Sequence, residues 1–425
     1  MVILVVHSRY FLSAGPERYL FNVMELLERE GNTVIPFSVA HSRNRASPYA
    51  KYFLQALGDG DERFFDEIAK TPRNVAKLIG RNFYSWEAIR KLGRLLTDHP
   101  VDVAYVLGYW RWISPSILHV LAARRIPIVV RLSDYHMLCS KSTFLRQGKP
   151  CELCKQGAWR HALRYRCVQG SLPVTLADVS ARWLHGTLGS FDLIHRFVAP
   201  SRFLFQKMIE GGYSENRLAL LPTFIDTSGI RPNYCPGDYL LYFGRIAPEK
   251  GLDVLLSAWA KVLARRNGEP RLALRIIGES NRGERERLEV RVRRERLPAV
   301  SFQAPVAEGE LQEVIAGAFC TVMPSLWYEN VPNAVLESYA FGKPVIASAI
   351  GSLPEVVKDE RTGLLARPGD AADLSRQLSR VLANPRWVAE LGRTARRYVE
   401  TECLPESHYE RLLAVLQRAV ADTRT

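Results

Sequence analysis

Short aliphatic runs that alternate with helical stretches constrain this chain more than any other feature of its sequence. Val2–Val6 is a continuous β-branched and aliphatic run, which is typical of a strand buried on both faces. A helical pattern follows over Pro16–Glu30, and Thr33–Phe37 is the next predicted strand. Further strands are predicted at Val103–Val106, Ile126–Leu132, Leu193–Val198 and Leu218–Leu221. This alternation predicts a parallel sheet with helices on both faces.

The same alternation begins again after residue 238. Tyr239–Phe243 is a second predicted buried strand, and Leu252–Leu263 has the apolar stripe of an amphipathic helix. Further strands are predicted at Leu272–Ile277, Cys320–Met323 and Pro344–Ala347, and further helices at Arg282–Arg296, Pro332–Phe341 and Ala371–Leu382. The stretch Gly229–Asp238, which contains proline and glycine, is typical of a linker. Two such domains usually bind ligands between them, at the carboxyl ends of their strands.

Composition sets the broad class of the protein and leaves its partner open. Apolar residues make up 47% and charged residues 24% of the 425 residues, which excludes a wholly disordered chain. No apolar run approaches the ~18–20 residues of a membrane-spanning helix, and Met1–Val6 is too short for a signal-peptide core. We therefore expect a cytoplasmic protein. The net charge of +14 favours phosphorylated substrates, acidic lipid head groups or polyanions, without choosing among them.

The segment 324–337 combines a strand end, a polar loop and a helix start. Pro332 suits the first helical turn, where the missing N–H costs nothing. The free N–H groups and the positive dipole end make such a helix start an anion site. Glu337 leans back toward this end and can accept hydrogen bonds from a polyol beside a bound phosphate, while Glu329 can meet another part of the ligand. Glu337 can equally be a solvated helix residue.

A second loop places two cations directly after a predicted strand. Arg245 and Lys250 lie in the sequence YFGRIAPEKG at 242–251. An arginine can bind a diphosphate through two parallel hydrogen bonds, and a lysine can act on it as a point charge. Taken alone, this loop can also be an exposed basic turn.

Together these motifs resemble the signature of retaining glycosyltransferase family 4. Glu329 and Glu337 are separated by seven residues and are followed by the matching stretches YAFGKPVIAS at 339–348, GSLPE at 351–355 and GLL at 363–365. The resemblance implies the GT-B fold, an α/β architecture of two Rossmann-like domains that face each other across a cleft. It divides the chain into an acceptor domain at 1–230, a nucleotide-sugar donor domain at 237–400 and a helix at 401–425 that returns to the first domain.

The resemblance also implies roles for single residues. Glu337 would hold the ribose of a nucleotide-sugar donor, and Glu329 would contact the transferred sugar. Arg245 and Lys250 would bind the diphosphate, so that these two residues and Glu329 are the catalytic candidates of the second domain. The other donor-binding residues implied are Gly15, Gly244, Asn330, Val331 and Asn333. Relatives often have paired glycines where this chain keeps only Gly15, and the loop is not the GxGxxG fingerprint of a dinucleotide oxidoreductase.

Asp134 and His136 are the catalytic candidates of the first domain, since they follow a strong predicted strand. Many family members have a histidine directly before the aspartate, close to the transferred sugar. This chain has Ser133 in that place. His136 can serve from a shifted position, or it can be a packing residue.

Four cysteines lie in a basic insertion at about 139–170. The pair Cys151 and Cys154 can clamp one face of a metal ion, and Cys139 and Cys167 can complete a tetrahedral site. This spacing predicts a structural zinc, with four unrelated reduced thiols as the alternative. Residues 141–170 hold seven Lys or Arg against one Glu, and a second basic helix with aromatic residues is predicted through 81–94. Such segments suit a membrane surface or a lipid diphosphate, and equally a solvated helix.

The predicted function is a retaining, metal-independent hexosyltransferase that moves a sugar from a nucleotide-sugar donor to an acceptor hydroxyl and needs no catalytic cofactor. Its basic surfaces favour a peripheral enzyme at the inner face of the cell membrane, acting on a lipid-linked glycan in cell-surface polysaccharide assembly. A nucleotide-sugar epimerase or a phosphorylase of the same fold is the alternative. A basic nucleic-acid-binding protein would leave the spacing of Glu329 and Glu337 unexplained, so no nucleic-acid partner is expected.

Overall fold

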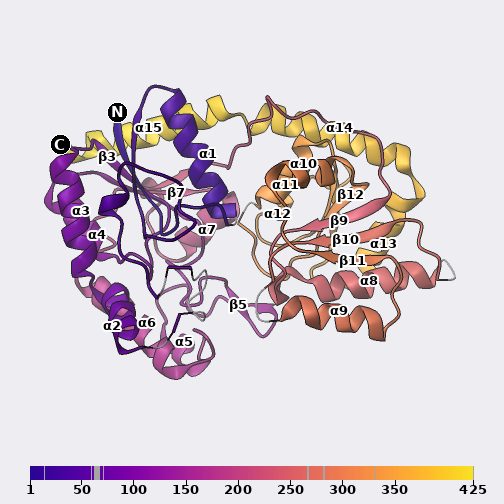
Figure 1. The fold of residues 1–425 in the computed structure, drawn as a ribbon, viewed down its shortest axis with the longest axis horizontal. Coiled ribbons are helices and arrows are strands. Elements are labelled where there is room, and N and C mark those ends of the chain that lie inside the picture. The colour runs from indigo at the N-terminus through magenta and orange to yellow at the C-terminus, as the bar shows by residue number, and fades with distance from the viewer. Residues whose placement is uncertain are drawn as a thin grey trace.

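The computed structural model has two lobes, each built around its own sheet (Figure 1). It describes residues 1–425 with the exception of 14, 59, 62–67, 70, 266–267, 281–282, 331 and 425. The predicted Val331 contact and the predicted helix start at Arg282 therefore lie outside the described residues. Within the described ranges, no helix is long and apolar enough to cross a membrane.

The first domain holds a six-stranded parallel sheet in the order β2-β1-β3-β4-β7-β8. Its strands are β1 Val2–Val6, β2 Thr33–Phe37, β3 Val103–Val106, β4 Ile128–Arg131, β7 Arg196–Ala199 and β8 Leu218–Leu220. Leu4 and Val6 pack into one hydrophobic cluster, while Ile3 and Val5 pack into another. The sheet is thus covered on both faces, which is why β1 is apolar at every position.

Helices cover both faces of this first sheet. The helices of the first domain are α1 Gly15–Arg29, α2 Pro72–Phe83, α3 Trp86–Asp98, α4 Ser116–Ala123, α5 Arg160–Arg164, α6 Leu172–Thr187 and α7 Arg202–Glu210. A small hairpin, β5 Leu145–Arg146 and β6 Lys149–Pro150, lies inside the cysteine-rich insertion.

The second domain repeats the plan with a parallel sheet in the order β11-β10-β9-β12-β13-β14. Its strands are β9 Tyr239–Phe243, β10 Ala273–Ile277, β11 Val300–Gln303, β12 Cys320–Met323, β13 Val345–Ser348 and β14 Gly363–Ala366. Its helices are α8 Leu252–Ala264, α9 Glu284–Arg294, α10 Glu308–Ala316, α11 Asn333–Ala340, α12 Leu353–Val356, α13 Ala371–Ala383 and α14 Pro385–Glu402. This strand order is that of the dinucleotide-binding fold, which reverses direction between β9 and β12.

The last helix, α15 Pro405–Arg424, crosses from the second domain back to the first (Figure 1). Leu412, Leu416 and Ala419 are fully buried in the core beneath the first sheet. His408 Nε2 lies 3.0 Å from the hydroxyl of Tyr19, while its Nδ1 lies 2.8 Å from a backbone carbonyl. The predicted return of the final helix to the first domain is therefore confirmed.

Three sequence expectations need correction. The basic helix predicted through 81–94 is two helices, because α2 ends at Phe83 and Ser85 caps the start of α3 by accepting a hydrogen bond from Ala88 N at 3.2 Å. The strands β11 and β14 were not predicted. Alternating exposure along β11 breaks the apolar run that marks an internal strand, and β14 contains a glycine.

Candidate active site

The loops after β9 and β12 lie side by side, because the strand order of the second sheet reverses between these two strands. Leu326 N donates to Glu249 O at 2.9 Å and joins the two loops directly. Gly251, at the end of the short helix Pro248–Lys250, has φ +73°. A Cβ there would lie 1.9 Å from Pro324 O, so this close approach requires glycine. The fold therefore brings the two predicted anion-binding segments together.

A buried ion pair links these loops. Lys250 Nζ lies 2.7 Å from Glu329 Oε1, and the side chains are 14% and 5% exposed. The same oxygen accepts hydrogen bonds from Ser325 Oγ at 2.6 Å and from Trp327 Nε1 at 2.8 Å. Burial alone would raise the pKa of Glu329, but the charge of Lys250 and these hydrogen bonds lower it. Glu329 is thus held as a carboxylate in a fixed orientation.

Arg245 lies at the more open side of the same loop. Its backbone oxygen accepts a hydrogen bond from the Tyr242 hydroxyl at 2.6 Å, and its guanidinium pairs with Glu249 Oε1 at 2.5 Å. The side chain is 37% exposed, so most of its N–H donors can reach an anion. Gly244, directly before Arg245, has φ +143°. Its carbonyl oxygen packs against Gly278, where an added Cβ would lie only 1.7 Å from that oxygen.

The start of α11 reaches across to the first domain. Asn333 Nδ2 donates to Gly15 O at 2.9 Å, so the N-terminal ends of α1 and α11 meet. Asn330 Nδ2 donates to Leu132 O at 2.9 Å, just beyond β4. These two predicted donor-binding residues therefore also hold the two domains together. The free N–H groups of α11 open toward the first domain at this point.

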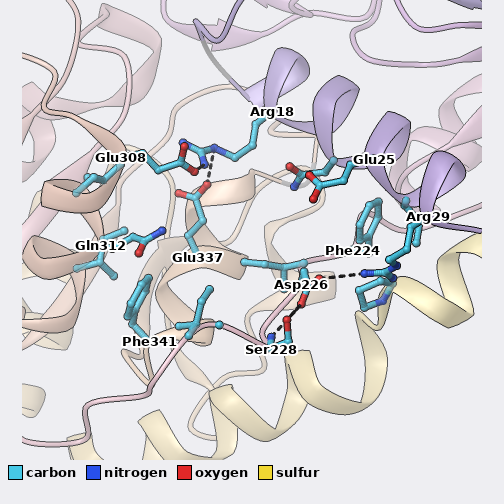
Figure 2. A pocket seen from close by; sticks show the side chains of 18 residues that line it. Arg18, Glu25, Arg29, Phe224, Asp226, Ser228, Glu308, Gln312, Glu337 and Phe341 are labelled. Atoms are coloured by element: carbon cyan, nitrogen blue, oxygen red, sulfur yellow. Dashed lines mark hydrogen bonds and ion pairs between the residues drawn. The ribbon is translucent and has the colours of Figure 1, made fainter. Parts of the chain in front are cut away.

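A cavity of about 300 Å³ lies between the domains, lined by α1, the segment 224–230, α10 and α11 (Figure 2). Glu337 stands in its wall, where Arg18 Nε is 2.9 Å from Glu337 Oε1. That contact is an ion pair without an aligned hydrogen bond. Arg18 also pairs with Glu308 at 2.7 Å. Burial raises the pKa of Glu337, Arg18 opposes this rise, and Glu308 adds to it.

Glu337 and the Lys250–Glu329 pair occupy different parts of the interdomain space. Glu337 lines the cavity, whereas Arg245, Lys250 and Glu329 do not. Both groups lie at the carboxyl edge of the second sheet. Glu329 is in the loop before α11, and Glu337 is in α11 itself. A long ligand could span both, because a nucleotide presents its diphosphate and its ribose to different neighbours.

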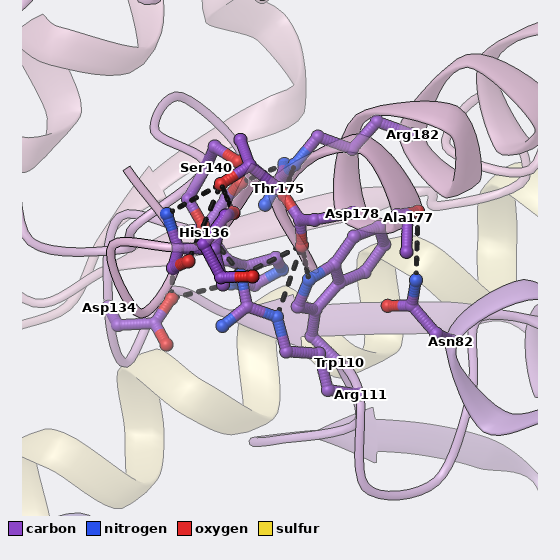
Figure 3. A network of polar contacts seen from close by, with 12 residues as sticks. Asn82, Trp110, Arg111, Asp134, His136, Ser140, Thr175, Ala177, Asp178 and Arg182 are labelled. Carbon is purple, nitrogen blue, oxygen red and sulfur yellow. Dashed lines mark hydrogen bonds and ion pairs between the residues drawn. The ribbon is translucent and has the colours of Figure 1, made fainter. Parts of the chain in front are cut away.

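Asp134 and His136 form a pair at the end of β4 (Figure 3). His136 Nδ1 lies 2.6 Å from Asp134 Oδ1, and His136 N donates to the same oxygen at 2.8 Å. The Asp134 carboxylate is half exposed, whereas His136 is buried and stacks on Trp110. Partial desolvation would raise the pKa of Asp134, but the charge and the hydrogen bonds of His136 lower it. Of the two roles that the sequence left open for His136, these surroundings favour the packing role.

The cysteine-rich insertion touches the second domain beside the candidate site. Tyr328 donates from its hydroxyl to Glu152 Oε1 at 2.8 Å. Burial raises the pKa of the Cys154 thiol to about 12, and the thiols of the other three cysteines reinforce the rise. Yet within the described residues no three His, Cys, Asp or Glu side chains gather closely enough to hold a metal ion. The structural zinc gains no support from this arrangement and stays a prediction, which metal analysis of the purified protein decides.

Several residues of this site escaped the sequence reasoning. Ser325 and Trp327 stand inside the quoted segment 324–337, but only the fold shows that both donate to Glu329. Arg18 and Glu308 are separated by 290 residues and meet only because the domains face each other. Local sequence carries no signal for such a pair.

Two facing Rossmann-like domains and a returning C-terminal helix define the GT-B fold of glycosyltransferases. Residues 237–384, which lie in the second domain, match the family described as "Glycosyl transferases group 1". The predicted resemblance and the predicted fold are both confirmed.

Curated relatives match the same part of the chain. D-inositol 3-phosphate glycosyltransferase of Streptomyces bingchenggensis is 35% identical over 168 residues, which are 38% of this chain and 36% of the relative. The protein of the same name from Frankia alni is 34% identical over 160 residues, 36% of this chain and 39% of the relative. The match thus spans little more than a third of each relative.

Solved structures resemble the whole chain. Sucrose-phosphate synthase from Thermosynechococcus elongatus has a TM-score of 0.72 and 18% identity, covering 99% of this chain and 100% of that one. HepE of Anabaena in complex with UDP has a TM-score of 0.64 and 16% identity, covering 98% and 100%. At these identities the likeness shows the fold alone.

Proposed function

We propose that this chain is a retaining glycosyltransferase that moves a sugar from a nucleotide-sugar donor to the hydroxyl of a lipid-linked glycan in cell-surface polysaccharide assembly. One observation carries the proposal. In a glycosyltransferase group 1 domain, the switch point of the sheet holds the buried Lys250–Glu329 pair, the accessible guanidinium of Arg245 and the start of α11 within two joined loops.

In this proposal the second domain binds the donor mainly by electrostatics. Arg245 and Lys250 supply two positive charges where negative charge grows on the departing diphosphate, and the start of α11 adds its N–H groups. These fixed charges act as a divalent cation would, so the proposed reaction needs no metal. Glu329, held by three donors, faces the transferred sugar, and Glu337 binds the ribose.

The ribose contact requires an exchange of partners. In this structure Arg18, on α1 of the first domain, is paired with the Glu337 carboxylate. A bound ribose would take over Glu337, and Arg18 would keep Glu308 or turn to the donor phosphates. Burial raises the pKa of Glu337 even with Arg18 beside it, so this carboxylate needs a new partner when Arg18 moves away.

The first domain supplies the acceptor side of the proposed reaction. The half-exposed carboxylate of Asp134 can accept a hydrogen bond from the acceptor hydroxyl or the transferred sugar. His136, buried behind it, fixes its orientation. The leaving phosphate then takes the acceptor proton on the face from which the nucleotide departs, so the product keeps the configuration of the donor.

A donor screen tests the proposal. UDP-, GDP-, ADP- and TDP-sugars are incubated with the full chain, with and without a lipid-linked glycan fraction. UDP-sugars come first, because HepE of Anabaena was solved with UDP. We expect one donor to be consumed, and the anomeric proton signal of the product to show retention. Glu337→Ala should abolish turnover, while the matched Glu310→Ala, an exposed glutamate on α10, should not.

Two outcomes would overturn the proposal. Turnover unchanged in Glu337→Ala would show that the ribose contact is misplaced. A donor converted to its epimer, or cleaved at the same rate without any acceptor, would favour the epimerase reading of the same fold.

A further inference from the structure

Helix α6 exposes apolar side chains to solvent and buries polar ones. Leu172, Leu176 and Trp183 are exposed by 46%, 52% and 69%. Their spacing of four and seven residues places them within about 40° around the helix axis. A continuous apolar stripe of this kind normally faces a protein core, but here it faces solvent.

The buried face of α6 is polar instead. Asp178 and Arg182 are buried and pair at 2.8 Å, and Arg111 joins them at 2.7 Å (Figure 3). Thr175 and His185, on the same side, are fully buried. Since paired polar side chains occupy the buried face, the apolar stripe lies on the side of α6 that faces away from the core. Its presence therefore needs another explanation.

Helix α2 repeats the arrangement next to α6. Its buried residues are Asn74 and Arg81, whereas Val75 and Ile79 are exposed by 39% and 53%. Asn82 Nδ2 donates to a backbone oxygen of α6 at 3.0 Å and holds the helices together. Figure 1 shows α2, α5 and α6 gathered at the lower end of the first domain, opposite the side along which α15 runs. Trp86, the first residue of α3, is 75% exposed. We call the exposed apolar residues of these neighbouring helices the "docking patch": Val75, Ile79, Trp86, Leu172, Leu176 and Trp183.

Exposed arginines flank the docking patch. Arg73 on α2 is exposed, as are three arginines in and just after α5, which packs against α6: Arg160, Arg164 and Arg166. The sequence from 141 to 190 contains only two acidic residues. Of these, Asp178 is buried, and Glu152 is paired with Lys155 and Lys207. An anionic surface is therefore the complementary partner.

We propose that the docking patch binds the surface of an anionic lipid bilayer, with Trp86 and Trp183 at the level of the head groups. Exposed tryptophan and leucine flanked by arginine is the composition of helices that lie in a bilayer interface. Each arginine near an anionic leaflet adds favourable electrostatic energy. The surface belongs to the domain to which we assign the lipid-linked acceptor, so this inference deepens the proposed function. It does not depend on the reaction, because binding is measured without a donor or an acceptor.

Vesicle flotation of the full chain tests the docking patch. The probes are vesicles of phosphatidylcholine alone and of equimolar phosphatidylcholine and phosphatidylglycerol, at low and at high salt. The test variant is Leu176→Gln/Trp183→Gln. The matched control is Val290→Gln, since Val290 is 54% exposed on α9 of the second domain. Both variants change exposed side chains, so far-UV circular dichroism and the thermal midpoint should match the wild type.

We expect the wild type and Val290→Gln to float with the anionic vesicles and to be released by salt. The double variant should bind at least about tenfold more weakly, since two apolar anchors are lost. Equal binding of the double variant, or no binding of the wild type, would overturn the proposal. So would self-association of the wild type that the double variant loses while neither protein floats, because the patch would then contact a second copy of the chain. Donor turnover with intact Glu337 dependence but no flotation would refute the patch alone.

Discussion

The Lys250–Glu329 pair offers a quantitative test of how the candidate site is held. Glu329→Gln keeps the shape of the side chain and an oxygen for Ser325 and Trp327, but it leaves the Lys250 ammonium without its counter-ion. Removing one partner of a buried pair costs about 3–5 kcal/mol. Lys250 is 14% exposed and can recover some hydration, so we expect a loss of about 3 kcal/mol in the free energy of unfolding.

The pH dependence of this loss follows from the lowered pKa of Glu329. A carboxyl group whose pKa is lower in the folded than in the unfolded state stabilises the fold above the unfolded pKa. That stabilisation disappears as the pH falls through the folded pKa. The difference between wild type and Glu329→Gln should therefore be full at neutral pH and shrink in acid.

Urea unfolding of the two single variants and the double variant Lys250→Met/Glu329→Gln completes the test. The double variant should be more stable than the sum of the single losses predicts, with a coupling of about 2 kcal/mol. Additive losses, or a loss below about 1 kcal/mol for Glu329→Gln, would refute the pair as a joint support of the two loops.

Three further predictions concern the frame around the site. Gly251→Ala should cost about 2 kcal/mol or more, because φ is +73° and a backbone carbonyl would lie 1.9 Å from the new Cβ; an unchanged thermal midpoint would contradict this. Burial lowers the pKa of His408 to about 3, so below about pH 6.5 the unfolded chain binds a proton at this histidine and the folded chain does not. Stability should fall by about 1.4 kcal/mol per pH unit from this group, and a His408→Gln variant with the same acid slope would refute the assignment. Tyr328→Phe removes the hydrogen bond to Glu152 and should speed proteolysis within residues 139–170. The exposed Tyr165→Phe serves as its control, and equal cleavage rates would count against this contact.

The sequence could predict the two sheets because parallel strands covered on both faces are apolar at every position. Val2–Val6 and Tyr239–Phe243 both have this character, and both lie in the interior of their sheets. The half-exposed edge strand β11 lacks it and was missed. The loops of the site were predictable for a related reason, since each directly follows an internal strand.

Contacts between the domains could not be predicted from local sequence. The pairing of Arg18 with Glu337 joins residues 319 positions apart, and the bond from Asn333 to Gly15 depends on how the lobes face each other. The reversed amphipathicity of α6 was equally hidden. Its apolar stripe has the ordinary helical period, and only the fold shows that Asp178 and Arg182 occupy the buried side.

Calorimetric titration of UDP into the wild type, Lys250→Met and Glu337→Ala tests the central claim most directly, with GDP, ADP and TDP as the parallel series. We expect one nucleotide to bind the wild type with a stoichiometry of one and each variant at least about tenfold more weakly, since each loses a charged contact to the ligand. Tight binding that neither substitution weakens would place the nucleotide elsewhere and contradict the assignment of this edge of the second sheet.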